Sequence, residues 1–139
     1  MFNNGVLPMK SELENLDQAS CLTIEAFVGH CLGLNHQGIG DLFAEDIRFE
    51  GPLTGGELKG KTLVQSHFRQ VFNRATHGGF IPETITADGR QVTIAWQPGH
   101  QIQGKEDQTR GQTIIDLDDE GLIKRVNVDW NPRLFLDLR

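Results

Sequence analysis

Residues 41–72 read DLFAEDIRFEGPLTGGELKGKTLVQSHFRQVF, and the order of elements within this stretch decides the fold. A strand is expected near its start, because apolar Ile47 and Phe49 are each followed by a charged residue. Successive side chains of a strand point to opposite faces, so Arg48 and Glu50 should point away from the core. The stretch therefore predicts a half-buried strand.

A turn and an amphipathic helix are expected after this strand. Gly51-Pro52 ends the strand, because proline has no N–H group for the next ladder bond. Thr62 is followed three residues later by Gln65, which matches a capping box and predicts the start of a helix. The apolar positions of that helix form one core-facing stripe, made of Val64, Phe68, Val71 and Phe72.

Two more helices are expected upstream. A long helix should cover residues 12–34, because apolar side chains recur there at i, i+3, i+4 and i+7, at Ile24, Phe27, Val28 and Cys31. Ile39, Leu42 and Phe43 have the i, i+3, i+4 spacing of a short helix directly before the strand.

Downstream of residue 72 the pattern is that of strands separated by turns. Strands are expected over residues 80–86, 91–97, 110–117 and 122–129. Asp88-Gly89 is typical of a hairpin turn. Pro98-Gly99 predicts a bulge or a bend, after which residues 100–104 would resume the strand. Helices first and a run of antiparallel strands last indicate an α+β fold.

The length and composition are those of a single globular domain. The chain has 139 residues, and we expect the domain to span residues 12–132, with a disordered leader over 1–11 and a C-terminal tail over 133–139. The net charge of −6 argues against nucleic-acid binding, which needs a basic face. No apolar run is long enough to span a bilayer, and no signal peptide is visible at the start. We therefore expect a cytoplasmic protein.

The five histidines and two cysteines do not form a recognisable metal motif. No histidine pair has HxH or HExxH spacing and the cysteines are not CxxC, so no metal and no other cofactor is expected. His67 should face outward or make a polar contact. Cys21 and Cys31 would lie about 15 Å apart in the long helix, whereas a disulfide needs Cα atoms within roughly 7 Å. No intramolecular disulfide is therefore expected.

The order helix end, "LFAED", strand, "G-P", glycine turn, "GK" and helix resembles the ketosteroid-isomerase-like superfamily, also called nuclear-transport-factor-2-like, and its SnoaL-like branch. The resemblance covers about residues 24–129. It implies an α+β cone of the cystatin-like kind, in which a curved antiparallel sheet wraps around N-terminal helices and encloses a cone-shaped cavity.

The resemblance does not extend to the catalytic groups of the ketosteroid isomerases. In those enzymes a tyrosine on the first helix and a protonated aspartate on a late strand form an oxyanion hole, and an aspartate after the first strand is the base. The corresponding positions of this chain hold Phe27, Thr113 and Gly51. A phenyl ring cannot donate to an enolate and glycine cannot take a proton, so this chemistry is not expected here.

Two other residues are candidates for catalysis. Asp129 lies near the place where limonene epoxide hydrolases, which share the fold, carry an aspartate that activates water; alternatively, it is only an acidic residue that ends a strand. His100 follows the expected bulge at Pro98-Gly99, and bulges often re-aim side chains at sites. The alternative for His100 is a solvent-exposed residue at the rim of the sheet.

Two functions remain open. One is an acid–base enzyme (isomerase, cyclase or hydratase) that acts on a small hydrophobic substrate through Asp129 and His100. The other is a non-catalytic module that binds a hydrophobic ligand, as the carotenoid-binding domain of the same fold does. In both, the expected lining of the cavity is Phe27, Phe49, Trp96, Thr113 and Trp130. A homodimer is also expected, because helices cannot cover both faces of the open sheet.

Overall fold

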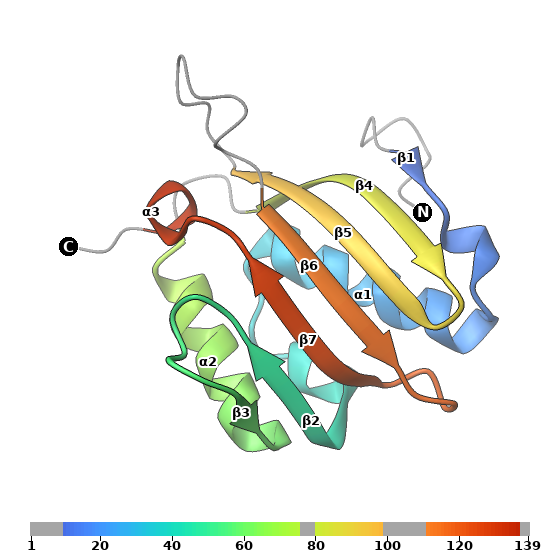
Figure 1. Ribbon diagram of the computed structural model, residues 1–139, viewed down its shortest axis with the longest axis horizontal. Helices are drawn as coiled ribbons and strands as arrows, with labels where there is room; N and C mark the ends of the chain where they lie inside the picture. Colours follow the sequence, from blue (N-terminus) through green and yellow to red (C-terminus); the bar gives the residue numbers. More distant parts are fainter. Residues whose placement is uncertain (1–9, 76–79, 99–110, 137–139) are drawn as a thin grey trace.

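The computed structural model describes residues 10–75, 80–98 and 111–136. Two long helices pack on one face of a curved sheet (Figure 1). The elements in chain order are β1 Lys10–Ser11, η1 Leu13–Asn15, α1 Gln18–Gly33, η2 Ile39–Leu42, β2 Phe43–Glu50, β3 Leu58–Lys59, α2 Lys61–Asn73, β4 Phe80–Asp88, β5 Gln91–Pro98, β6 Gly111–Leu117, β7 Ile123–Asp129 and α3 Pro132–Phe135. This is the predicted α+β architecture.

Within the described residues the sheet has seven strands in the order β1-β4-β5-β6-β7-β2-β3. Strands β4 to β7 form the predicted antiparallel run. The early strand β2 lies beside the late strand β7 and runs parallel to it, with Arg48 opposite Arg125. The sequence pattern did not predict this parallel pair. None of the described helices is long and apolar enough to cross a membrane.

Strand β2 has the predicted two faces. Ile47 and Phe49 are buried, whereas Arg48 and Glu50 are exposed. The strand also begins earlier than expected, at Phe43, and only Ile39–Leu42 forms a short 3₁₀ helix. The expectation that Phe43 continues that helix is wrong, because Phe43 is the first residue of β2. Its side chain is buried in the core.

Helix α2 buries the predicted stripe of Val64, Phe68, Val71 and Phe72. The predicted capping box is wrong, because the helix begins at Lys61 and its N-cap is Gly60 without a side-chain cap. Gly60 has a φ of 97°, a backbone conformation that favours glycine, and its N–H donates to the Ile47 carbonyl at 2.8 Å. The turn from β3 therefore fixes the start of the helix.

Helix α1 begins at Gln18 rather than near residue 12. The carboxylate of Asp17 accepts a hydrogen bond from the Ser20 N–H at 2.8 Å, which caps the helix and sets its start. Cys21 and Cys31 are both free, as predicted.

The end of the chain contributes to the core. Phe135 and Leu136, which lie in the expected tail, are 1% and 4% exposed. The ring of Phe135 stacks on Phe80, with centroids 5.4 Å apart and planes 11° apart. An irregularity lies in β4 between Pro82 and Thr84, while the predicted bulge at Pro98-Gly99 lies partly outside the described residues.

Candidate functional site

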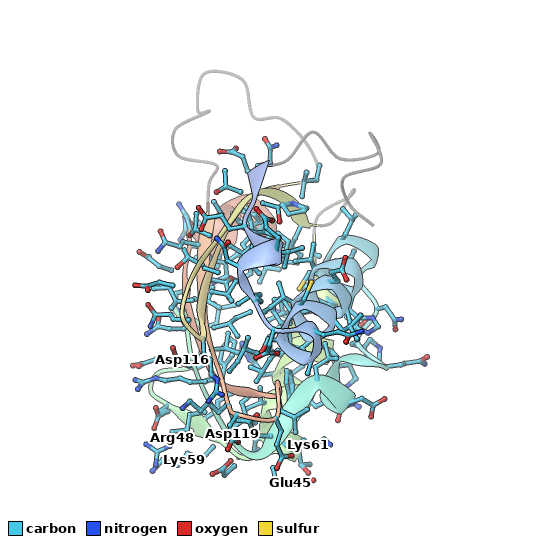
Figure 2. The ribbon with its side chains drawn as sticks, turned by 90° about the vertical axis from the view of Figure 1, so that its right-hand side faces the viewer. Glu45, Arg48, Lys59, Lys61, Asp116 and Asp119 are labelled. Atoms are coloured by element: carbon cyan, nitrogen blue, oxygen red, sulfur yellow. The ribbon has the colours of Figure 1, made fainter. Side chains whose placement is uncertain are left out.

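A cavity of about 50 Å³ lies between the helices and the inner face of the sheet. Figure 2 shows the two layers from the side, with side chains filling the space between them. Most of the cavity wall is aromatic, and the rings come from both layers: Phe27, Phe49, Phe68, Phe72, Phe80, Trp96, Trp130 and Phe135. The wall is therefore suited to apolar molecules.

All five residues expected to line a ligand cavity lie on this wall: Phe27, Phe49, Trp96, Thr113 and Trp130. They come from α1, β2, β5, β6 and the residue after β7. The structure thus brings together residues that are far apart in the sequence. Their role in binding remains a prediction.

The ring of Phe68 lies at the centre of the packing on the α2 side. Its centroid is 5.9 Å from that of Phe27, 5.4 Å from that of Phe49 and 5.8 Å from that of Phe72, and all three pairs are edge-to-face. Edge-to-face pairs stabilise each other beyond the area they bury. This part of the wall is therefore held in place before any ligand arrives.

Thr113 of β6 and Trp96 of β5 form a buried hydrogen bond on the part of the cavity wall that the sheet supplies. The indole N–H of Trp96 donates to Oγ1 of Thr113 at 2.9 Å. A hydroxyl group has one hydrogen and two lone pairs, so Thr113 can still donate its own hydrogen.

His67 also lines the cavity, so the expectation that it faces outward is wrong. Its ring lies 4.8 Å from the ring of Phe49, centroid to centroid. Burial lowers the pKa of His67 below its ordinary value of 6.5, which leaves the imidazole neutral at pH 7. The sequence did carry the signal: Val64, His67, Phe68 and Val71 have i, i+3, i+4, i+7 spacing.

Asp129 does not reach the cavity. It is exposed, while its neighbours Val128 and Trp130 line the wall, because successive residues of a strand point to opposite faces. The geometry therefore does not support Asp129 as a base for a ligand in the cavity. His100 lies outside the described residues.

The resemblance matches Phe27, Thr113 and Gly51 to the positions of the catalytic groups of ketosteroid isomerases, and two of these three residues lie on the cavity wall. Phe27 and Thr113 line it, and a Cβ atom added at Gly51 would lie 3.3 Å from the Phe49 ring and 3.5 Å from Val128. No carboxylate of the described residues lines the wall. The thiol of Cys31 does line it, but burial raises its pKa far above the usual range, so it stays protonated.

The described residues contain no group of three or more His, Cys, Asp or Glu side chains that could hold a metal ion. On the cavity wall, Thr113 can donate a hydrogen bond and the neutral imidazole of His67 can accept a proton.

Comparison with known protein families shows to which family the chain belongs. The SnoaL-like domain family matches residues 24–126. The chain belongs to the SnoaL-like family. No curated protein matches this SnoaL-like chain.

Solved structures share the fold. A steroid delta-isomerase from Pseudomonas aeruginosa superposes with a TM-score of 0.66 at 20% identity, over 88% of this chain and 82% of the other. A protein of Sinorhizobium meliloti with a proposed polyketide cyclase activity superposes with a TM-score of 0.62 at 14% identity, over 85% of this chain and 99% of the other. A de novo designed protein with a curved β-sheet superposes with a TM-score of 0.65 at 15% identity, over 85% of this chain and 89% of the other. At these identities the similarity of the SnoaL-like domain to each structure shows the fold alone.

Proposed function

We propose that this SnoaL-like protein binds a small, mostly apolar molecule in the cavity between its helices and its sheet. The observation that carries the proposal is the wall itself, which is aromatic on both layers and has no carboxylate among the described residues. Ligand sites are typically concave, apolar and supplied with a few polar groups, and the polar groups here include His67 and Thr113.

The size of the cavity limits the ligand. Pockets for drug-sized molecules have volumes of roughly 300–1,000 Å³, and an engineered cavity of about 150 Å³ binds benzene. The cavity here measures about 50 Å³. A steroid-sized molecule does not fit without movement of the walls. A single small ring also exceeds the present volume, so side chains of the wall must move to admit it, but by much less than a steroid requires.

Acid–base catalysis is the second candidate function. Neutral His67 supports it, because a neutral imidazole in the cavity can take a proton from a bound substrate. The similarity to a steroid delta-isomerase adds an example of such chemistry on this fold. Against it stand Phe27, Gly51 and Thr113 at the positions of the isomerase groups. The proposed activity is therefore binding, with an isomerase, cyclase or hydratase step as the alternative.

Toluene titration tests the binding proposal directly, with the fluorescence of Trp96 and Trp130 as the readout. The wild type should bind toluene. Val71→Phe should abolish binding, because Val71 lines the cavity and the added ring fills it. Leu63→Phe is the matched control, because Leu63 is exposed on the same helix. A wild type that binds none of toluene, phenol and benzaldehyde would refute the proposal, and binding that survives Val71→Phe would place the site elsewhere.

We also propose that the protein forms a homodimer through the open face of its sheet. Figure 2 shows α1 and α2 on one side only, while side chains such as Arg48 and Asp116 project from the other side. On that face Arg125 and Asp129 flank Asn127, which pairs with Ile114 of β6. A two-fold axis along the Ile114–Asn127 row would place Arg125 opposite the partner's Asp129, and charge complementarity supports this arrangement.

A charge swap tests the homodimer. Sedimentation equilibrium should show a dimer for the wild type and a monomer for Arg125→Glu, because two carboxylates would then face each other. The double variant Arg125→Glu/Asp129→Arg should restore the dimer. Arg69→Glu, which makes the same charge change on the helix layer, should remain dimeric. A monomeric wild type at micromolar concentration would exclude the proposal.

A further inference from the structure

Besides the two tryptophans, four of the described residues on the cavity wall carry polar groups. Gln112 is exposed to solvent and Cys31 carries a thiol; the other two, His67 and Thr113, come from opposite layers. His67 lies on α2 and Thr113 lies on β6, and both line the same cavity. Figure 1 shows α2 behind the sheet to which β6 belongs. A molecule held in the cavity therefore lies between one imidazole and one hydroxyl group.

Thr113 has a hydrogen left to donate. Its oxygen already accepts from the Trp96 indole at 2.9 Å, which fixes one lone pair. In residues 10–75, 80–98 and 111–136 no acceptor for the Thr113 hydrogen is found. Because Thr113 is 5% exposed and lines the cavity, a molecule held there can accept that hydrogen.

His67 has an acceptor to offer. The described part of the chain makes no hydrogen bond to its imidazole, which packs against the ring of Phe49. Among these residues only Ser20 Oγ is both fully enclosed and without a partner, so the imidazole nitrogens of His67, which lines the cavity, are not fully enclosed by the described residues. A neutral imidazole has one N–H donor and one lone-pair acceptor, and burial lowers the pKa enough to keep it neutral.

We infer that the ligand of this cavity is a small ring or chain that carries one hydroxyl group, a phenol or an alcohol, which accepts a hydrogen bond from Thr113 and donates one to His67. This inference rests on the proposed binding function. A hydroxyl group is the smallest group that is both donor and acceptor, so one such group satisfies both side chains. An unsubstituted hydrocarbon leaves both unpaired, and a carbonyl group can accept from Thr113 but cannot donate to His67.

Three probes of similar size separate these cases: phenol, toluene and benzaldehyde. Titration calorimetry should show that phenol binds about tenfold or more tightly than toluene, as two added hydrogen bonds imply, and also more tightly than benzaldehyde. In protein labelled with ¹⁵N, the imidazole nitrogens of His67 should shift on addition of phenol and not on addition of toluene.

His67→Phe provides the decisive variant, because it keeps an aromatic ring against Phe49 and removes both ring nitrogens. It should still bind toluene and should lose the preference for phenol. Thr113→Ser retains the hydroxyl group and should keep the preference, and His36→Phe, outside the cavity wall, should behave as wild type.

Equal binding of phenol and toluene, or an undiminished preference in His67→Phe, would overturn the inference and leave the apolar site intact. A benzaldehyde preference would replace the hydroxyl class by a carbonyl class. Failure of all three probes to bind would instead refute the proposed binding function, and the inference with it.

Discussion

His67 is a titratable ring placed among aromatic rings, and this position has a cost that depends on pH. Burial lowers its pKa below 6.5 in the folded protein, whereas the unfolded chain keeps the ordinary value. Between 6.5 and the lowered value, the unfolded state binds the proton and the folded state does not. The contribution of neutral His67 to the free energy of unfolding should therefore be fully present above pH 6.5. It should be lost as the pH falls through that window.

This pH dependence can be assigned to one side chain. Urea unfolding of the wild type and of His67→Gln at pH 7.5 and at pH 5 should show a larger loss of stability for the wild type, since glutamine does not titrate. The other histidines are common to both proteins and cancel in the comparison. Equal losses in the two proteins would mean that His67 has the same pKa folded and unfolded.

Thr113 offers a second prediction at the scale of one residue. Thr113→Val keeps the shape but removes the acceptor of the Trp96 N–H, which would then be buried without a partner. The expected loss is about 1–3 kcal/mol, measured by urea unfolding. Thr113→Ser keeps the oxygen and should lose less. A valine variant as stable as wild type would show that water replaces the lost bond.

At the scale of elements, the turn between β6 and β7 is fitted against the start of α1. Gly121 in this turn has a φ of 83°, and its carbonyl accepts a hydrogen bond from Oγ1 of Thr23. A Cβ atom at this position would lie 2.9 Å from the backbone and side chain of Ala19. The turn and the helix therefore leave no room for a side chain.

Gly121→Ala should destabilise the protein more than Gly89→Ala does. Gly89, in the β4–β5 hairpin, also has a positive φ, of 59°, but nothing lies within 4 Å of an added Cβ. The left-handed backbone alone costs an alanine about 1–2 kcal/mol, and this term is common to both variants. The contact with Ala19 adds to it only at Gly121. Thermal or urea unfolding of the two variants should show this difference, and equal losses would contradict the close contact.

The element scale also shows how much the sequence could predict. Alternation placed Ile47 inside and Arg48 outside in β2, because a half-buried strand imposes that pattern locally. The same alternation cannot say which strand lies beside β2, so the parallel pairing with β7 was not predicted. Helical spacing included His67 in the α2 stripe, but the polarity of histidine led to the wrong prediction that this side chain faces outward. Asp129 has the right residue type for a base, but its register turns it away from the cavity.

At the scale of the whole molecule, the end of the chain completes the aromatic wall. Phe135 of α3 stacks on Phe80 and lies 5.1 Å from the ring of Trp130. Phe135→Ala should cost roughly 3–5 kcal/mol, as expected for truncation of a buried phenylalanine. Leu53→Ala, at an exposed position, should cost little. Urea unfolding measures both, and a small loss for Phe135→Ala would mean that α3 does not hold its place in solution.

The parallel pairing of β2 with β7 also affects how the protein reaches its native state. Arg48 lies opposite Arg125, so two segments far apart in the chain must meet before the β2–β7 edge is paired. A high contact order slows folding, because the entropy of closing a long loop is lost before the contact forms. During synthesis on the ribosome, one edge of β2 stays unpaired until β7, Ile123–Asp129, has emerged. That edge is exposed in the interval, and an exposed strand edge can pair with another chain, so the nascent protein is open to aggregation at this stage.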